Sequence, residues 1–163
     1  MSAGLSIRAA RPADRDLVFA FVRELADYEK LPHEVDATPA AIERALFAPS
    51  PLVFCDIAEW DDAPAGFALW FYNFSTFRGR HGIYLEDLFV RPSFRGKGLG
   101  KALLSNLAKR AKAEGCARVE WSVLDWNEPS IEFYESLGAK ALDEWTVFRL
   151  TDDALRRLAD GAP

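Results

Sequence analysis

Cysteine, histidine and methionine are scarce in this sequence. Its 163 residues include two cysteines, two histidines and one methionine. Cys55 and Cys116 lie far apart in the chain, and neither belongs to a Cys-x-x-Cys pair. This pattern excludes a disulfide scaffold and a cysteine-rich zinc site, and it fits a reducing compartment. We therefore expect a cytoplasmic protein that holds no metal ion.

Positive charge and long apolar runs are also lacking. Lysine and arginine number 20 against 25 aspartates and glutamates, which gives a net charge of −5. Without a basic run, binding to nucleic acid or to an anionic membrane is a poor fit. No apolar run reaches the roughly 18 residues of a transmembrane helix, and the first residues lack a signal-peptide pattern. We expect a soluble protein whose partners include neither nucleic acid nor a membrane.

Apolar residues, in contrast, are plentiful enough to fill a core. They make up 50% of the chain and include 12 phenylalanines, 5 tryptophans and 4 tyrosines. The length is close to that of one domain at about 150 residues per domain. The sequence therefore predicts a single domain over residues 1–163, with its core over residues 6–150, and excludes a disordered protein.

Strand-like and helix-like segments follow one another along the chain. Short apolar runs bounded by turn residues predict strands, and apolar residues spaced by three and four predict helices. The expected strands are 6–9, 52–59, 66–74, 83–90, 118–124 and 147–150, and the expected helices are 14–28, 39–47, 99–115, 127–137 and 152–158. This order predicts an α/β fold (an α+β mixed sheet), with a central sheet flanked by helices.

A cluster of three glycines stands directly before one of these helices. Gly96, Gly98 and Gly100 let the backbone approach an anion closely, and a helix N-terminus offers free N–H groups. The Walker pattern fails because Ala102 stands where it needs serine or threonine, and the dinucleotide fingerprint fails because Lys101 stands where it needs glycine. We expect the loop to bind another anion, such as a pyrophosphate.

Two adjacent acids, Glu86 and Asp87, interrupt the apolar strand before this loop. Burying a carboxylate without a partner is unfavourable, so at least one of the two needs a partner or a task. Strict alternation places Glu86 on one face of the strand with Tyr84, Leu88 and Val90. It places Asp87 on the other face, together with Ile83, Leu85 and Phe89.

The glycine loop matches a known signature. Arg95-x-x-Gly98-x-Gly100 resembles the coenzyme A motif of the GCN5-related N-acetyltransferase (GNAT) superfamily, Q/R-x-x-G-x-G/A. Residues 84–90, 126–134 and 24–29 are also similar to the spermidine/spermine (diamine) N-acetyltransferase subgroup. The resemblance spans about residues 6–150 and implies the GNAT fold.

The resemblance implies that acetyl-CoA is the acetyl donor. Its pyrophosphate would lie on the loop and the first turn of the helix, and its pantetheine arm would pair with the preceding strand. Three residues of the later helix would complete the site. The implied residues are Arg95, Gly96, Lys97, Gly98, Leu99, Gly100 and Lys101 for the pyrophosphate, Leu88, Phe89 and Val90 for the arm, and Asn127, Ser130 and Tyr134 on the later helix.

The resemblance also implies the acid and the base of the transfer. An alkyl amine with a pKa near ~10 is mostly protonated at neutral pH, so a proton acceptor is needed. Glu86 would take that proton, and Tyr134 would protonate the departing thiolate. The amine itself would bind at Tyr28, Glu29, Glu86, Asp87 and Glu144. The segment between Gly138 and Trp145 is shorter than in the animal polyamine enzymes, which leaves the distal part of the amine site open.

Several functions fit these residues. The first is direct acetyl transfer to a small diamine or polyamine, since no cysteine or serine is placed as a nucleophile. The alternatives are transfer to thialysine or a lysine-like amino acid, transfer to a protein, and acetyl-CoA binding without catalysis. The resemblance also implies a homodimer in which the strand around residues 145–150 completes or crosses the partner's sheet.

Overall fold

The computed structural model describes residues 4–161, which form two compact units that divide between Leu124 and Asp125. The first unit holds the sheet with helices α1, α2 and α3, and the second holds α4 and α5. One domain over the full length therefore stays a prediction.

The first unit is built on a five-stranded sheet in the order β1-β2-β3-β4-β5. The first four strands are antiparallel to their neighbours, whereas β5 runs parallel to β4 and is reached through α3. A parallel pair needs such a crossover. The mixed sheet confirms the predicted fold class. Its strands are β1 (Leu5–Ala9), β2 (Phe54–Trp60), β3 (Ala63–Ser75), β4 (Arg80–Val90) and β5 (Val119–Glu120).

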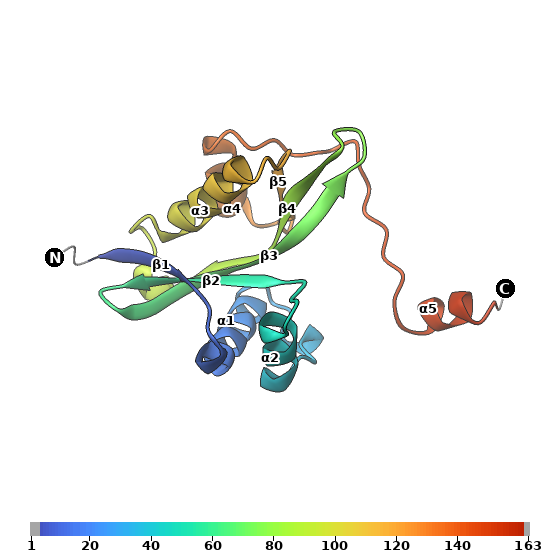
Figure 1. Cartoon of the computed structure of the whole chain (residues 1–163), viewed down its shortest axis with the longest axis horizontal. Coiled ribbons are helices and arrows are strands. Elements are labelled where there is room, and N and C mark those ends of the chain that lie inside the picture. The colour runs from blue at the N-terminus through green and yellow to red at the C-terminus, as the bar shows by residue number, and fades with distance from the viewer. Residues whose placement is uncertain (1–3, 162–163) are drawn as a thin grey trace. The chain divides into compact units, whose positions relative to one another are not determined.

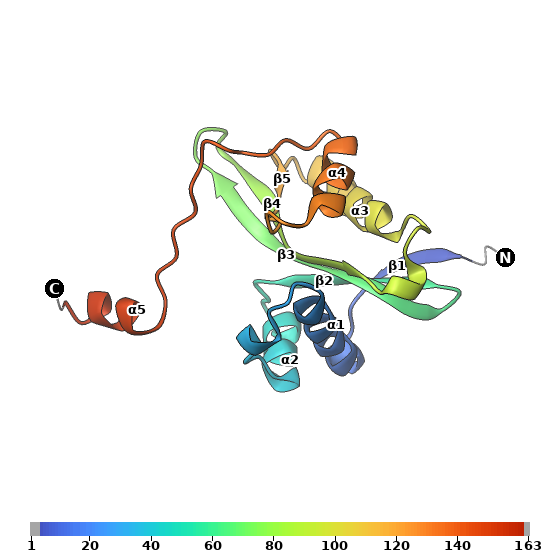
Figure 2. The same ribbon diagram turned by 180° about the vertical axis from the view of Figure 1, so that it is seen from behind.

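Helices cover both faces of this sheet. Figures 1 and 2 show α1 and α2 on one face and α3 on the other. The helices are α1 (Arg15–Tyr28), α2 (Pro39–Phe47) and α3 (Leu99–Ala113), and the short 3-10 helices are η1 (Pro12–Asp14), η2 (Pro32–Glu34) and η3 (Pro92–Phe94).

The core between the sheet and α1 follows the predicted apolar stripe. Phe21 of α1 stacks on Phe67 of β3 with ring centroids 5.2 Å apart, and both side chains are fully buried. The predicted cap of α2 is confirmed, because the Thr38 side chain accepts a hydrogen bond from the Ala41 N–H at 3.1 Å. The buried cluster consists of Val18, Phe21, Leu25, Leu46, Cys55, Ile57, Phe67 and Phe89.

The second unit contains α4 (Glu128–Ser136) and α5 (Asp152–Ala159). Asn127 occupies the predicted N-cap position of α4, but its side chain makes no capping hydrogen bond. Gly138 adopts the expected left-handed conformation after the helix, with φ of +90°.

The prediction of a strand at 147–150 is wrong. No helix or strand lies between α4 and α5, and the Val147 and Phe148 side chains are 84% and 92% exposed. An apolar run becomes a strand only where a neighbouring strand takes up its backbone hydrogen bonds, and no strand among residues 4–161 pairs with it. The predicted strand 118–124 is likewise reduced to β5.

Candidate functional site

The edge of β4 that faces β5 is open over the second half of the strand. Within the described residues, β5 pairs with β4 only at Ile83 and Tyr84, whereas β4 continues to Val90. An unpaired strand edge accepts an extended segment as an added strand. Residues 88–90, expected to pair with the pantetheine arm, lie on this open edge. The backbone therefore fits an acetyl-CoA arm.

A β-bulge lies at the start of the open edge. In the register of β3 and β4, Trp70 pairs with Leu85 and the adjacent Leu69 pairs with Asp87. Glu86 is the extra residue between them and has no partner in this register. A bulge of this kind bends its strand and turns side chains to new directions.

This bulge shows that the predicted alternation is wrong across Glu86. Trp70 faces α3, because the Arg110 guanidinium of that helix lies 5.0 Å from its ring centroid. Leu69 packs against the buried cluster on the α1 face. Their partners Leu85 and Asp87 therefore lie on opposite faces of the sheet, although they are two residues apart. Asp87 shares the α1 face with Phe89.

The two adjacent acids consequently differ in their surroundings. Glu86 is exposed on the bulge, whereas Asp87 is partly buried. Burial raises the pKa of Asp87 from 3.8 to about 7, and the charges of Glu86 and Glu29 add to this effect. Burial also raises the pKa of Glu29. Asp87 and Glu29 thus repel each other when both are ionised, and an ammonium group between them would relieve that repulsion.

Glu29 is held at the end of α1 by the backbone. It is the C-cap residue, and Lys30 after it adopts a left-handed conformation with φ of +62°. The N–H groups of Lys30 and Leu31 donate to the carbonyls of Asp27 and Ala26, at 3.1 and 2.8 Å. These two bonds form a Schellman motif, here with lysine where glycine is usual. The motif fixes the direction in which the chain leaves α1, and hence the place of Glu29.

An arginine at the end of β4 fixes α1 against the sheet. Arg91 donates two hydrogen bonds of 2.9 Å to the Glu24 carboxylate on α1. A third bond of 3.0 Å reaches the Pro64 carbonyl. Its guanidinium also lies 4.7 Å from the Phe21 ring centroid. Because such a bidentate pair has a fixed geometry, it sets the distance between the C-terminal part of α1 and the end of β4. Sequence reasoning missed this pair, since nothing local relates Arg91 to Glu24.

The glycine loop has the backbone expected of an anion cradle. Gly96 and Gly98 have φ of +77° and +82°, and Gly98 is the N-cap residue of α3. A Cβ at either glycine would meet nothing within 4 Å, so the space beside the loop is open. The N–H groups of Leu99, Gly100 and Lys101 in the first helical turn have no acceptor within the helix. The loop and the first turn therefore fit a pyrophosphate.

Two charged side chains of the loop, those of Arg95 and Lys97, lie near aromatic rings of other elements. The Lys97 ammonium lies 4.7 Å from the Trp60 ring centroid on β2. The Arg95 guanidinium lies 4.9 Å from the Tyr28 ring centroid and 5.7 Å from that of Phe89. The structure thus brings Arg95 to the end of α1, whereas the sequence suggested only that Arg95 contacts the pyrophosphate.

The remaining predicted site residues belong to the second unit. Tyr134 and Ser130 are partly buried on α4, and Asn127 is 6% exposed before it. The Tyr134 ring lies 5.5 Å from that of Phe133. Glu144 is exposed in the segment between α4 and α5. Their roles as donor and substrate contacts stay predictions.

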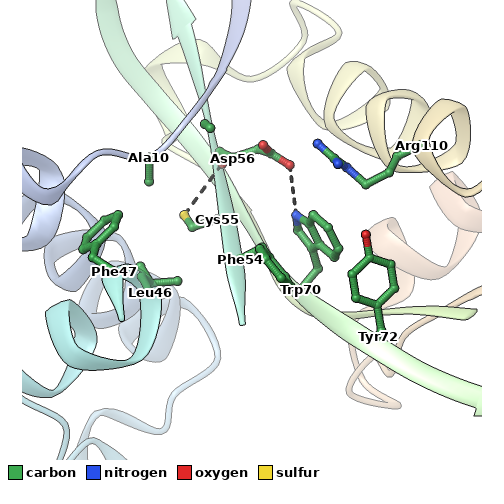
Figure 3. Close-up of a pocket in the computed structure, with 10 residues that line it drawn as sticks. Ala10, Leu46, Phe47, Phe54, Cys55, Asp56, Trp70, Tyr72 and Arg110 are labelled. Atoms are coloured by element: carbon green, nitrogen blue, oxygen red, sulfur yellow. Dashed lines mark hydrogen bonds between the residues drawn. The ribbon is translucent and has the colours of Figure 1, made fainter. Parts of the chain in front are cut away.

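A separate pocket lies at the start of β2, with β3 between it and the bulge of β4. Its cavity is about 160 Å³. In Figure 3, Asp56, Trp70 and Arg110 lie on one side of β2 and Cys55, Leu46 and Phe47 on the other.

Asp56 in this pocket is a buried acid that sequence reasoning passed over. Its carboxylate accepts hydrogen bonds from the Trp70 indole at 3.0 Å and from Asn106 of α3 at 3.4 Å. Burial raises its pKa. The bond with Asn106 joins the sheet to α3, and the bond with Trp70 joins β2 to β3. The only signal in the sequence was a single acid within an apolar run.

Residues 4–161 contain no group of three or more histidine, cysteine, aspartate or glutamate side chains that could hold a metal ion. None of their helices combines the length and the apolarity needed to cross a bilayer.

Comparison with known proteins points to one family. The chain is 37% identical to the thialysine N-epsilon-acetyltransferase of Bos taurus, over 94% of this chain and 96% of that protein. It is 33% identical to the L-ornithine N5-acetyltransferase NATA1 of Arabidopsis thaliana, over 93% and 86%. Among solved structures, an integron cassette protein from the mobile metagenome of V. cholerae has a TM-score of 0.79 at 29% identity, covering 96% of this chain and 98% of that one. Because the family described as "Acetyltransferase (GNAT) family" matches residues 18–139, the chain belongs to the GNAT family of acetyltransferases.

Proposed function

We propose that this acetyltransferase moves the acetyl group of acetyl-CoA to the side-chain amine of a lysine-like amino acid such as thialysine. The observation that supports a cationic amine as the substrate is the pair Asp87 and Glu29, set beside the open edge of β4, and the choice of a lysine-like amino acid rests on the relatives. Two relatives named above act, by their names, on the side-chain amines of thialysine and ornithine.

Each acid has its own part in the proposed reaction. Asp87 and Glu29 bind the substrate ammonium, with Tyr28 beside them, and Glu86 on the bulge accepts the proton that the ammonium loses. The freed nitrogen forms a bond to the acetyl carbon while the carbon–sulfur bond breaks, and the nitrogen then releases its second proton, which replaces the one that Tyr134 gives up. Tyr134 donates a proton to the departing thiolate. Acetyl-CoA, when bound, supplies the activated acetyl thioester.

The remaining proposed roles concern binding. The backbone of residues 96–101 would hold the pyrophosphate, and residues 88–90 the pantetheine arm. Asn127 and Ser130 would contact the donor from α4, and Glu144 would add negative charge for the amine. A homodimer and a cytoplasmic location stay predictions.

A diamine or polyamine is the second candidate substrate. The segments 84–90, 126–134 and 24–29 resemble the diamine subgroup, and the acids of the proposed amine site suit a polycation equally well.

The proposal is tested by measuring thiol release from acetyl-CoA with the purified protein at mildly alkaline pH. The amines are thialysine, lysine, ornithine, putrescine, spermidine and a peptide with a free N-terminus. We expect the highest kcat/KM with thialysine or another lysine-like amino acid. A preference for putrescine or spermidine would select the polyamine function. Binding of acetyl-CoA without turnover of any amine would select a protein substrate or a non-catalytic binder.

A further inference from the structure

The exposed Arg95 side chain lies near two aromatic rings. Its guanidinium lies 4.9 Å from the ring centroid of Tyr28, the last residue of α1, and 5.7 Å from that of Phe89 on β4. Its Nε donates a hydrogen bond of 3.0 Å to the Val90 carbonyl. One side chain of the glycine loop thus contacts both the end of α1 and the end of β4.

Arg95 is not among the charges that shift the pKa of the two acids Asp87 and Glu29. The charges that act on the pKa of Asp87 are those of Glu86 and Glu29, and both raise it. For Glu29, burial alone accounts for the raised pKa. The guanidinium lies over the ring of Tyr28, the neighbour of Glu29.

We propose that Arg95 is a positioning residue that couples the donor loop to the amine site through the Tyr28 ring. The inference rests on the proposed function and gives Arg95 a task beyond contact with the pyrophosphate. An anion on the loop amides restrains the loop, and Arg95 passes this restraint to Tyr28 and Glu29. Because the bound donor has already ordered this segment, binding of the amine then costs less conformational entropy.

The planar guanidinium suits this task and an ammonium group does not. Arginine stacks on aromatic faces and donates from a fixed fork, whereas lysine is a flexible point charge. Arg95→Lys therefore keeps the positive charge for the pyrophosphate but loses the stack on Tyr28. Tyr28→Phe keeps the ring, and Tyr28→Leu removes it.

Hydrogen exchange tests the coupling without any turnover. The N–H groups of Lys30 and Leu31, bonded to Asp27 and Ala26, report on the end of α1. Saturating acetyl-CoA should slow their exchange in the wild type and in Tyr28→Phe, but not in Arg95→Lys or Tyr28→Leu. Equal slowing in all four proteins would overturn the inference. If acetyl-CoA binds but no amine is acetylated, the proposed function fails while this exchange measurement still decides the coupling.

Steady-state kinetics test the consequence for the amine. Arg95→Lys and Tyr28→Leu should each raise the amine KM about fivefold, the size expected for one lost cation–π contact. The double variant should be no worse than either single one, because both remove the same contact. Tyr28→Phe, which keeps the ring, should raise the amine KM less than Tyr28→Leu does. Additive effects on the amine KM would show that Arg95 does not act through Tyr28. A rise confined to the KM for acetyl-CoA would show that Arg95 acts on the donor alone.

Discussion

At the scale of the residue, the proton on Asp87 makes the stability of the protein depend on pH. Its pKa is raised from 3.8 to about 7, first by burial and then by the charges of Glu86 and Glu29. Between about pH 4 and pH 7, the folded protein retains a proton at Asp87 that the unfolded chain has released. The folded state binds more protons there, so stability falls as pH rises through this window and levels off above it.

Asp87→Asn should therefore stabilise the protein above pH 7. The amide cannot ionise, so the loss of stability between about pH 4 and pH 7 disappears. Above pH 7 the free energy of unfolding should therefore rise by on the order of 3 kcal/mol. Urea unfolding at a series of pH values measures it. The same variant should raise the amine KM, since the ammonium loses one of its two acids. A stable Asp87→Asn protein with an unchanged amine KM would remove Asp87 from the amine site.

Glu86→Gln is the matched control one residue away. Glu86 is exposed on the bulge, and its charge raises the pKa of Asp87 less than burial does. Removing that charge should lower the upper end of the pH window and so reduce the loss of stability without abolishing it. A Glu86→Gln profile as flat as that of Asp87→Asn would mean that Asp87 does not carry the retained proton.

At the scale of the element, the sequence predicted most strands and helices but not the bulge in β4. Turn residues and apolar spacing located α1, α2 and α3 to within a residue or two. The predicted alternation failed at Glu86, because a bulge depends on the register with β3. This bulge also contains no glycine or asparagine from which it could have been predicted. The two adjacent acids were the only local sign. The strand predicted at 147–150 failed for a related reason, since pairing is decided by residues far away in the chain.

The glycines at the two ends of α3 provide a matched pair of variants. Gly98 and Gly115 have φ of +82° and +71°, and a Cβ at either one would meet nothing within 4 Å. Alanine at each position should cost a similar ~1 kcal/mol of backbone strain. Only Gly98→Ala places a methyl group where the pyrophosphate is expected. We expect its affinity for acetyl-CoA to fall about tenfold or more, equivalent to ~1.4 kcal/mol, with Gly115→Ala close to the wild type.

Calorimetric titration with acetyl-CoA, and thermal unfolding of both variants, check this comparison. Similar melting temperatures together with a selective loss of binding in Gly98→Ala would support the loop as the donor site. Equal affinities in the two variants would place the pyrophosphate elsewhere.

At the scale of the whole molecule, the family was predictable and the long-range contacts were not. The motif Arg95-x-x-Gly98-x-Gly100 was enough to indicate the GNAT family, which the match over residues 18–139 confirms. The contacts of Arg95 with Tyr28 and of Arg91 with Glu24 join segments distant in sequence. No local pattern marks such contacts, because they arise only when α1 packs on the sheet.

The net charge of −5 gives the whole molecule a field that attracts cationic amines. Attraction grows with the charge of the substrate, and salt screens it: the Debye length falls from about 30 Å at 10 mM to about 10 Å at 100 mM. The kcat/KM for spermidine should therefore fall more steeply with added salt than that for thialysine, with kcat unchanged in both cases. The measurement is a salt series at saturating acetyl-CoA. Equal slopes for the two amines would mean that the partly buried Asp87 and Glu29, which salt screens less, determine amine capture alone.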